Sequence, residues 1–179
     1  MMTRYVALFG SINVGGNRLK MVDLRDALER EEFEDVETVV ASGNVLFTHE
    51  ERPSEGLAEK LAYVVQDRFG IETFAVVRSR DELQAALDES PFAGEGEDNL
   101  VHVHFLEGQP DAEAFDKLIA DHAGKGAERI APGTRALHVD YVDGTGNSKL
   151  TGGFIARRLG CRGTARNVRS IARIIEKMD

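Results

Sequence analysis

A chain of 179 residues, 42% hydrophobic and 30% charged, has a globular composition and is long enough to bury a core without disulfides. Its one cysteine, Cys161, excludes an internal disulfide and a cysteine-based zinc site, which fits a reducing compartment. The net charge is −9, and the first apolar run, residues 5–9, is too short for a signal peptide or a membrane span, so we expect a cytoplasmic protein with no membrane partner.

The first half of the chain predicts the order β-α-β-β-α-β of a ferredoxin-like unit. Its expected elements are a strand at 5–9, a helix through Met21, Leu24 and Leu28, strands at 36–41 and 45–48 around the turn Ser42-Gly43-Asn44, a helix from Leu57 to Phe69 that Gly70 ends, and a strand at 73–77. The turn between two β-branched runs is typical of a hairpin. We expect this hairpin at the end of the sheet opposite the loop that follows the first strand.

The second half of the sequence predicts a similar order of strands and helices, with less regular patterns. Ser79 and Glu82 form a capping box that begins a helix, and Pro91 ends it. The later elements are a strand at 101–106, a helix through Phe115, Leu118 and Ile119 that Gly124 ends, strands at 129–131 and 136–142 around Pro132-Gly133, a helix from Leu150 to Leu159 that Gly160 ends, and a last helix with an apolar stripe of Val168, Ile171, Ala172 and Ile175. We therefore expect an α/β (α+β) protein with a ferredoxin-like half at residues 1–78 and a second α/β half at residues 79–179.

Positive charge is concentrated at the end of the chain. From Lys149 onward there are eight cationic and two acidic residues, a net charge of +6, which leaves −15 on the first 148 residues. On a continuous helix, Arg166, Arg169, Arg173 and Lys177 would fall within about 80° of one another, opposite the apolar stripe. Such a basic helix indicates an anionic partner, or else a tail that docks on the acidic part of the same molecule.

Five short segments match, in order, the motifs of one family. They are Leu8-Phe9-Gly10-Ser11-Ile12-Asn13-Val14-Gly15-Gly16, Ser42-Gly43-Asn44-Val45, Ser90-Pro91-Phe92, Ser148-Lys149-Leu150 and Thr164-Ala165-Arg166-Asn167. In these segments the chain resembles the domain of unknown function family 1697 (DUF1697) over nearly its whole length. The resemblance implies two intertwined ferredoxin-like halves, and it implies no reaction and no catalytic residue.

Three positions depart from the family pattern. Gly10 stands where the family usually has an arginine, Ser90 where it has an asparagine, and Val168 where it has an aromatic residue. If that arginine binds a ligand in the family, this chain either uses another group or has lost the role.

Two loops in the first half contain candidate ligand-binding residues. Asn13, Gly15, Gly16 and Asn17 lie between a strand and a helix, where glycines let backbone N–H groups approach an anion. The alternative is a tight turn in which the asparagines cap backbone groups. The side chains of Ser42 and Asn44 either bind the ligand together with this loop or only stabilise the hairpin.

Two helix starts in the second half add polar and cationic residues. Ser148 is a predicted N-cap with Lys149 beside it, and Thr164 is a predicted N-cap with Arg166, Asn167 and Arg169 following. Arginine forks suit phosphate or carboxylate groups. The alternative is that these arginines pair with acidic residues of the same chain or of an oligomer.

Metal and nucleophile chemistry have weaker support. His102 and His104 share one strand face, and His138 and Asp140 share another, which permits a metal cluster if the strands are neighbours. The histidines alternate with apolar residues as in a half-exposed strand, so we expect no metal and no cofactor. Cys161 has a cationic neighbour but no catalytic context.

The leading hypothesis is a binding module for an anionic ligand, either a phosphorylated small molecule, a nucleotide or RNA. A second is a small enzyme acting on a phosphorylated metabolite, in which Lys149 and Arg166 stabilise charge and the base is unassigned. A third is a protein interaction or self-association domain, such as a homo-oligomer, built on the basic helix.

Overall fold

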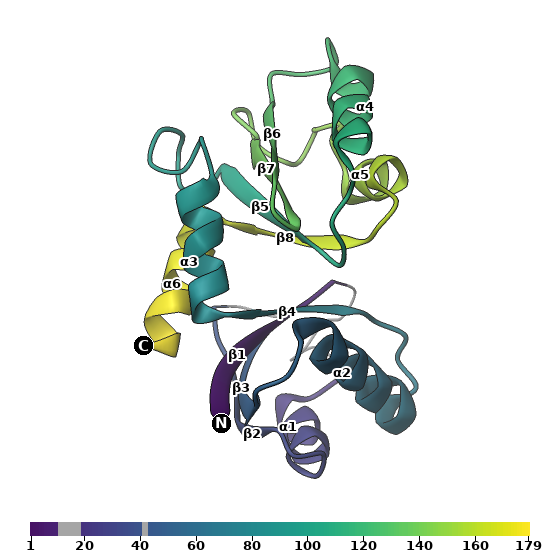
Figure 1. Cartoon of the computed structure of the whole chain (residues 1–179), viewed down its shortest axis with the longest axis vertical. Coiled ribbons are helices and arrows are strands. Elements are labelled where there is room, and N and C mark those ends of the chain that lie inside the picture. The colour runs from purple at the N-terminus through teal and green to yellow at the C-terminus, as the bar shows by residue number, and fades with distance from the viewer. Residues whose placement is uncertain (11–18, 41–42) are drawn as a thin grey trace. The chain divides into compact units, whose positions relative to one another are not determined.

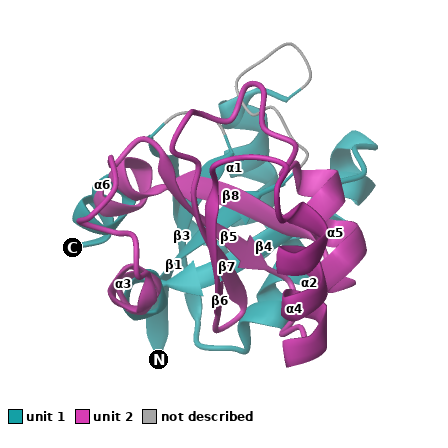
Figure 2. Ribbon diagram, turned by 90° about the horizontal axis from the view of Figure 1, so that it is seen from above, with its two compact units in different colours: residues 1–83, 173–179 teal, residues 84–172 magenta. Residues whose placement is uncertain are grey.

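The chain folds into two compact units. The computed structural model describes residues 1–10, 19–40 and 43–179. One unit contains residues 1–83 and 173–179, and the other contains residues 84–172 (Figure 2). The unit boundaries fall inside two helices, α3 (Arg80–Glu89) and α6 (Val168–Met178), so each of these helices contributes residues to both units.

The first unit has the ferredoxin-like order that the sequence predicts (Figure 1). Its elements are β1 (Met2–Phe9), α1 (Met21–Glu29), β2 (Glu34–Thr38), β3 (Asn44–Glu50), α2 (Ser54–Phe69) and β4 (Ala75–Ser79). The strands form one antiparallel sheet in the order β2-β3-β1-β4. Leu24, Leu28, Leu57 and Leu61 of the two helices are fully buried and share one core with strand residues such as Phe47.

The second unit repeats the same topology. Its elements are β5 (Val101–Leu106), α4 (Ala112–His122), β6 (Arg129–Gly133), β7 (Ala136–Asp140), α5 (Gly152–Leu159) and β8 (Gly163–Asn167). The sheet order β6-β7-β5-β8 is that of the first unit, again antiparallel throughout. The chain therefore contains two four-stranded ferredoxin-like sheets, and the predicted fold class is confirmed.

The turn of the second hairpin differs from the prediction. Pro132 and Gly133 belong to β6, and the turn is made by Thr134 and Arg135, with Arg135 at φ 48°. Gly133 is needed in the strand for space, because a Cβ there would lie 2.5 Å from Oε1 of Glu89. Glycine is therefore needed at position 133 for close packing. The turn residue with positive φ is Arg135, which the sequence pattern did not indicate.

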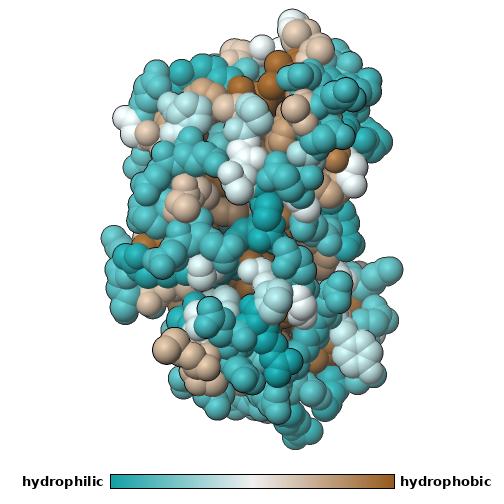
Figure 3. Space-filling model, viewed as in Figure 1, coloured by the Kyte–Doolittle hydropathy of each residue, from teal (hydrophilic) through white to brown (hydrophobic). Residues whose placement is uncertain are grey.

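The buried residues of α6 also differ in part from the predicted apolar stripe. Ile171, Ile174 and Ile175 are buried, whereas Ala172 is exposed. Among the described residues, no helix combines the length and apolar character needed to cross a membrane. The face of the molecule in Figure 3 is predominantly hydrophilic, and its apolar residues are scattered.

A buried hydrogen-bond chain ties β5 to the segment before α5. Nε2 of His104 lies 3.0 Å from the Tyr141 hydroxyl, which donates to the Leu150 carbonyl at 3.1 Å. Because the hydroxyl hydrogen is used in that second bond, Nε2 of His104 must carry a proton and donate. Burial, with smaller contributions from the charges of His102 and His138, lowers the pKa of His104 to about 3.

This pKa predicts an acid-sensitive stability. An unfolded histidine takes up a proton near pH 6.5, so the stabilising contribution of neutral His104 is complete above that pH and is lost as the pH falls toward about 3. We expect the free energy of unfolding to fall by about 1.4 kcal/mol per pH unit from this group alone. The variant His104→Gln keeps an N–H donor without a titrating group, so urea unfolding at pH 7 and pH 5 should show a smaller loss than in the parent. Parallel losses in the two proteins would contradict the assignment.

Candidate functional site

Five predicted ligand-binding residues lie outside the described part of the chain. They are Asn13, Gly15, Gly16, Asn17 and Ser42. Their proposed role as an anion-binding loop with a hairpin residue beside it stays a prediction.

The hairpin lies at the same end of the first sheet as the end of β1, so the expectation that the two lie at opposite ends was wrong. Antiparallel pairing of β1 with β3 sets Leu8 opposite Asn44, and the Phe9 N–H donates to the Gly43 carbonyl at 2.8 Å. The Asn44 side chain is 2% exposed and donates to the Val40 carbonyl at 2.9 Å. This bond stabilises the hairpin. The end of β1 is close enough for one ligand to contact both β1 and the hairpin.

The departure at Gly10 has a steric explanation. The Gly10 N–H donates to the Phe74 carbonyl at 3.0 Å, and a Cβ built on Gly10 would overlap the Phe74 ring. The ring therefore occupies the space in which an arginine side chain at position 10 would begin.

Register places the two C-terminal motifs at one end of the second sheet. Val101, at the start of β5, pairs with Asp140 at the end of β7, and His102 pairs with Asn167 at the end of β8. The loop at 141–150 and the β8–α6 junction therefore leave the sheet at the same end.

The first of these motifs does not begin a helix at Ser148. The N-cap of α5 is Thr151, whose hydroxyl accepts from the Phe154 N–H at 3.2 Å. Ser148 instead donates to Glu128 at 3.0 Å and accepts from the Leu150 N–H at 3.1 Å. Lys149 is exposed beside it. The serine therefore fixes the loop before the helix, because its hydroxyl donates to a carboxylate and accepts from a backbone N–H at the same time.

The predicted N-cap at Thr164 was also wrong. Thr164 and Arg166 lie in β8, and the cap of α6 is Asn167, whose side-chain oxygen accepts from the Ser170 N–H at 2.8 Å. Arg166 donates to the Thr164 hydroxyl at 2.6 Å and to the Ala165 carbonyl at 2.9 Å. Burial lowers the pKa of Arg166 to about 10, which still leaves it cationic at neutral pH.

The basic helical face therefore consists of Arg169, Arg173 and Lys177. All three are exposed and spaced four residues apart on α6. By contrast, Arg158 pairs with Asp121 at 3.2 Å and Arg162 with Glu107 at 3.1 Å. Across residues 1–10, 19–40 and 43–179, no side chain of the basic helical face forms an ion pair.

Acidic residues border this face. The Arg169 N–H donates to the Asp98 carbonyl at 3.1 Å, which holds the backbone of the acidic 95–98 loop beside the first turn of α6. Glu176 occupies the edge of the face on the helix itself.

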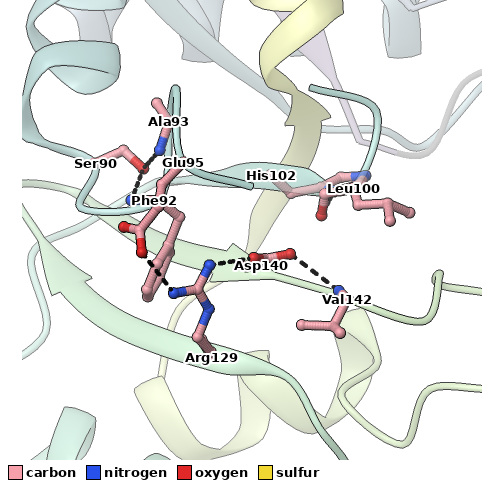
Figure 4. Close-up of polar contacts among 9 residues, drawn as sticks. All are labelled: Ser90, Phe92, Ala93, Glu95, Leu100, His102, Arg129, Asp140 and Val142. Carbon is pink, nitrogen blue, oxygen red and sulfur yellow. Dashed lines mark hydrogen bonds and ion pairs between the residues drawn. The ribbon is translucent and has the colours of Figure 1, made fainter. Parts of the chain in front are cut away.

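The positive charge of Arg129 is balanced by two neighbouring carboxylates (Figure 4). Arg129 bonds Asp140 at 2.6 Å and Glu95 at 3.3 Å, and its guanidinium lies 4.9 Å from the Phe92 ring centre. The bond from Asp140 raises the pKa of Arg129 above its usual value. Ser90 accepts from the Phe92 and Ala93 N–H groups, each at 3.2 Å, and so serves as a turn acceptor. This cluster holds the 90–95 turn against β6 and β7.

The histidines have separate partners. His102 lies 3.0 Å from the Leu100 carbonyl, and His138 contacts Glu89 at 2.7 Å. Within the described residues, no three His, Cys, Asp or Glu side chains gather in a geometry that could hold a metal ion. Sequence reasoning missed the carboxylates of Glu89 and Glu128, since nothing in the local pattern distinguishes them from 31 acidic residues in all.

Comparison with known proteins identifies a family and a similar solved structure. The family model for "Protein of unknown function (DUF1697)" matches residues 2–138. The solved structure of the conserved bacterial protein SP0830 from Streptococcus pneumoniae is similar, with a TM-score of 0.68, 22% identity and complete coverage of both chains. No curated protein matches the sequence significantly. This structural similarity supports the fold described above.

The packing of Gly10 against Phe74 yields a double-mutant test. Gly10→Ala should cost about 1–3 kcal/mol of unfolding free energy, because the new methyl group overlaps the ring. In a Phe74→Ala background the same substitution should be nearly neutral, which urea unfolding of the four proteins measures. Strictly additive costs would show that the ring does not restrict position 10.

Proposed function

The chain belongs to the DUF1697 family of proteins of unknown function, and on that premise we propose that it binds a phosphate-bearing ligand through the basic helical face of α6. The observation that carries the proposal is the contrast between paired Arg158 and Arg162 and the exposed cations of α6. Exposed charge is often merely solvated, but three aligned cations sum their potentials at one surface.

The spacing suits an extended anion. Residues four apart on a helix have Cβ atoms about 5–6 Å apart, and Arg169 to Lys177 spans about 12 Å of helix. Such a row contacts successive phosphates of a strand more readily than it encloses one small phosphate. Two of its three cations are arginines, whose forks bind phosphate oxygens bidentately. The preferred ligand is therefore a short single-stranded RNA.

Negative charge elsewhere limits the expected affinity. The net charge of −9 repels a polyanion, but at physiological ionic strength this repulsion is screened beyond about 8 Å. The backbones of Asp98 and Arg169 are hydrogen-bonded, so we expect the Asp98 carboxylate to compete with the ligand for Arg169. The proposal includes a cytoplasmic location, which a chain with one cysteine suits.

The test is the binding of a fluorescent ten-nucleotide oligouridine as a function of salt. Three phosphate contacts predict that log affinity falls with log salt at a slope of about −2, since each contact contributes about 0.7 on a single strand. Arg173→Gln should weaken binding and reduce the slope by about 0.7. Asp98→Asn should strengthen binding, because it removes a competing charge near Arg169.

The matched control is Arg157→Gln on α5, which removes another exposed arginine. If Arg157→Gln costs as much affinity as Arg173→Gln, binding reflects diffuse charge and the proposed site is wrong. Saturable binding of a mononucleotide with a shallow salt response would instead indicate a compact phosphate site. Sedimentation of the same variants separates ligand binding from self-association, which stays a prediction of the sequence.

A further inference from the structure

A cavity of about 400 Å³ lies in the second unit between the β5–α4 connection and the β6–β7 hairpin. We propose that this cavity binds a small organic ammonium ion, held by the carboxylates of Glu89 and Asp116. Its volume falls within the range of small-molecule sites, and its lining combines polar and apolar surface. This inference does not depend on the basic helical face.

Glu89 is held in one orientation at the cavity wall. Its Oε1 accepts from the Thr134 N–H at 2.9 Å and contacts Nε2 of His138 at 2.7 Å, while Oε2 accepts from the Thr134 hydroxyl at 2.7 Å. Burial acts to raise the pKa of Glu89, but the bonds from His138 and Thr134 outweigh it and lower the pKa. A carboxylate has about four acceptor positions, so one remains for a ligand N–H group.

The two walls of the cavity are joined before any ligand binds. The Gln109 side chain accepts from the Arg135 N–H at 2.6 Å and donates to the Gly133 carbonyl at 3.3 Å. Pro110 and Pro132 stiffen the two walls. Preformed walls reduce the ordering cost of binding, so a small ligand retains more of its interaction energy.

The charges at the cavity select a cation. Glu89 and Asp116 line it, and no lysine or arginine is among its described lining residues. The positive end of α4 also faces the cavity, but it amounts to about half a charge and Asp111 caps it through a 2.8 Å bond to the Ala114 N–H. Pro132, which is exposed, supplies an apolar surface for an alkyl chain. An alkylammonium ion has both the positive charge that the carboxylates attract and an alkyl chain for the apolar surface.

The position of the cavity corresponds to a motif-bearing site of the first unit. In the first unit, the connection after β1 and the β2–β3 hairpin lie at one end of the sheet, with Leu8 opposite Asn44. In the second unit, the connection after β5 and the β6–β7 hairpin occupy the equivalent end, with Phe105 opposite Ala136. The cavity therefore lies at the end of the second sheet that is equivalent to the hairpin end of the first sheet.

The experiment is a titration of the full chain followed by amide NMR signals, with butylammonium chloride as the probe and butan-1-ol as its neutral control. Ionic strength is held constant with sodium chloride. Butylammonium should shift the signals of Thr134 and Phe115 saturably and bind at least about fivefold more tightly than butan-1-ol. Equal affinities would overturn the role of the carboxylates, and shifts confined to other residues would overturn the site.

Three variants separate a local site from general acidity. Asp116→Asn should weaken butylammonium binding about fivefold, whereas Glu113→Gln, an equal charge change on the same helix outside the lining, should change it less than about twofold. Ala112→Leu fills the cavity from the exposed first turn of α4 without changing charge, and it should abolish binding while the protein still melts cooperatively. Equal losses in the two charge variants, or unchanged binding in Ala112→Leu, would overturn the proposal.

Discussion

Antiparallel pairing of β5 with both β7 and β8 determines where most of the candidate residues lie. Because β5 runs against both neighbours, its start meets the ends of β7 and β8, and its end meets their starts. One end of the sheet therefore carries the 95–98 loop, the 141–150 loop and the first turn of α6. The other end carries the β6–β7 hairpin and the start of α4. Residues distant in sequence become neighbours through this register alone.

The element order of the first unit was predictable because it rests on local patterns, whereas β8 of the second unit was predicted as a helix start. Apolar spacing, the Ser79–Glu82 capping box and the terminal glycines Gly70 and Gly160 each act within a few residues, and the structure contains all of them. The N-caps of α5 and α6 were misassigned because competing partners lie far away in sequence. Glu128 binds Ser148 across 20 residues, a contact that no local pattern encodes. The cavity was likewise not predictable, since Glu89 meets Thr134 across 45 residues.

The cationic residues of the described chain differ in whether a carboxylate pairs with them. Cations that have acidic neighbours, such as Arg129 and Arg158, hold turns and helices in place. The cations of the basic helical face lie on α6, and the carboxylates of Glu89 and Asp116 line the cavity. The net charge of −9 averages over both regions, so it describes neither of them. Local charge within about one Debye length is the relevant quantity for each ligand.

The first unit is built from two separate stretches of the chain. Residues 173–179 belong with residues 1–83, and Arg80 pairs with Asp179 to connect the two segments. During synthesis on the ribosome, the first unit must therefore wait for all 89 residues of the second before its last helical turns arrive. Contacts of such long sequence separation form slowly, so the nascent chain holds an incomplete first unit for most of its translation.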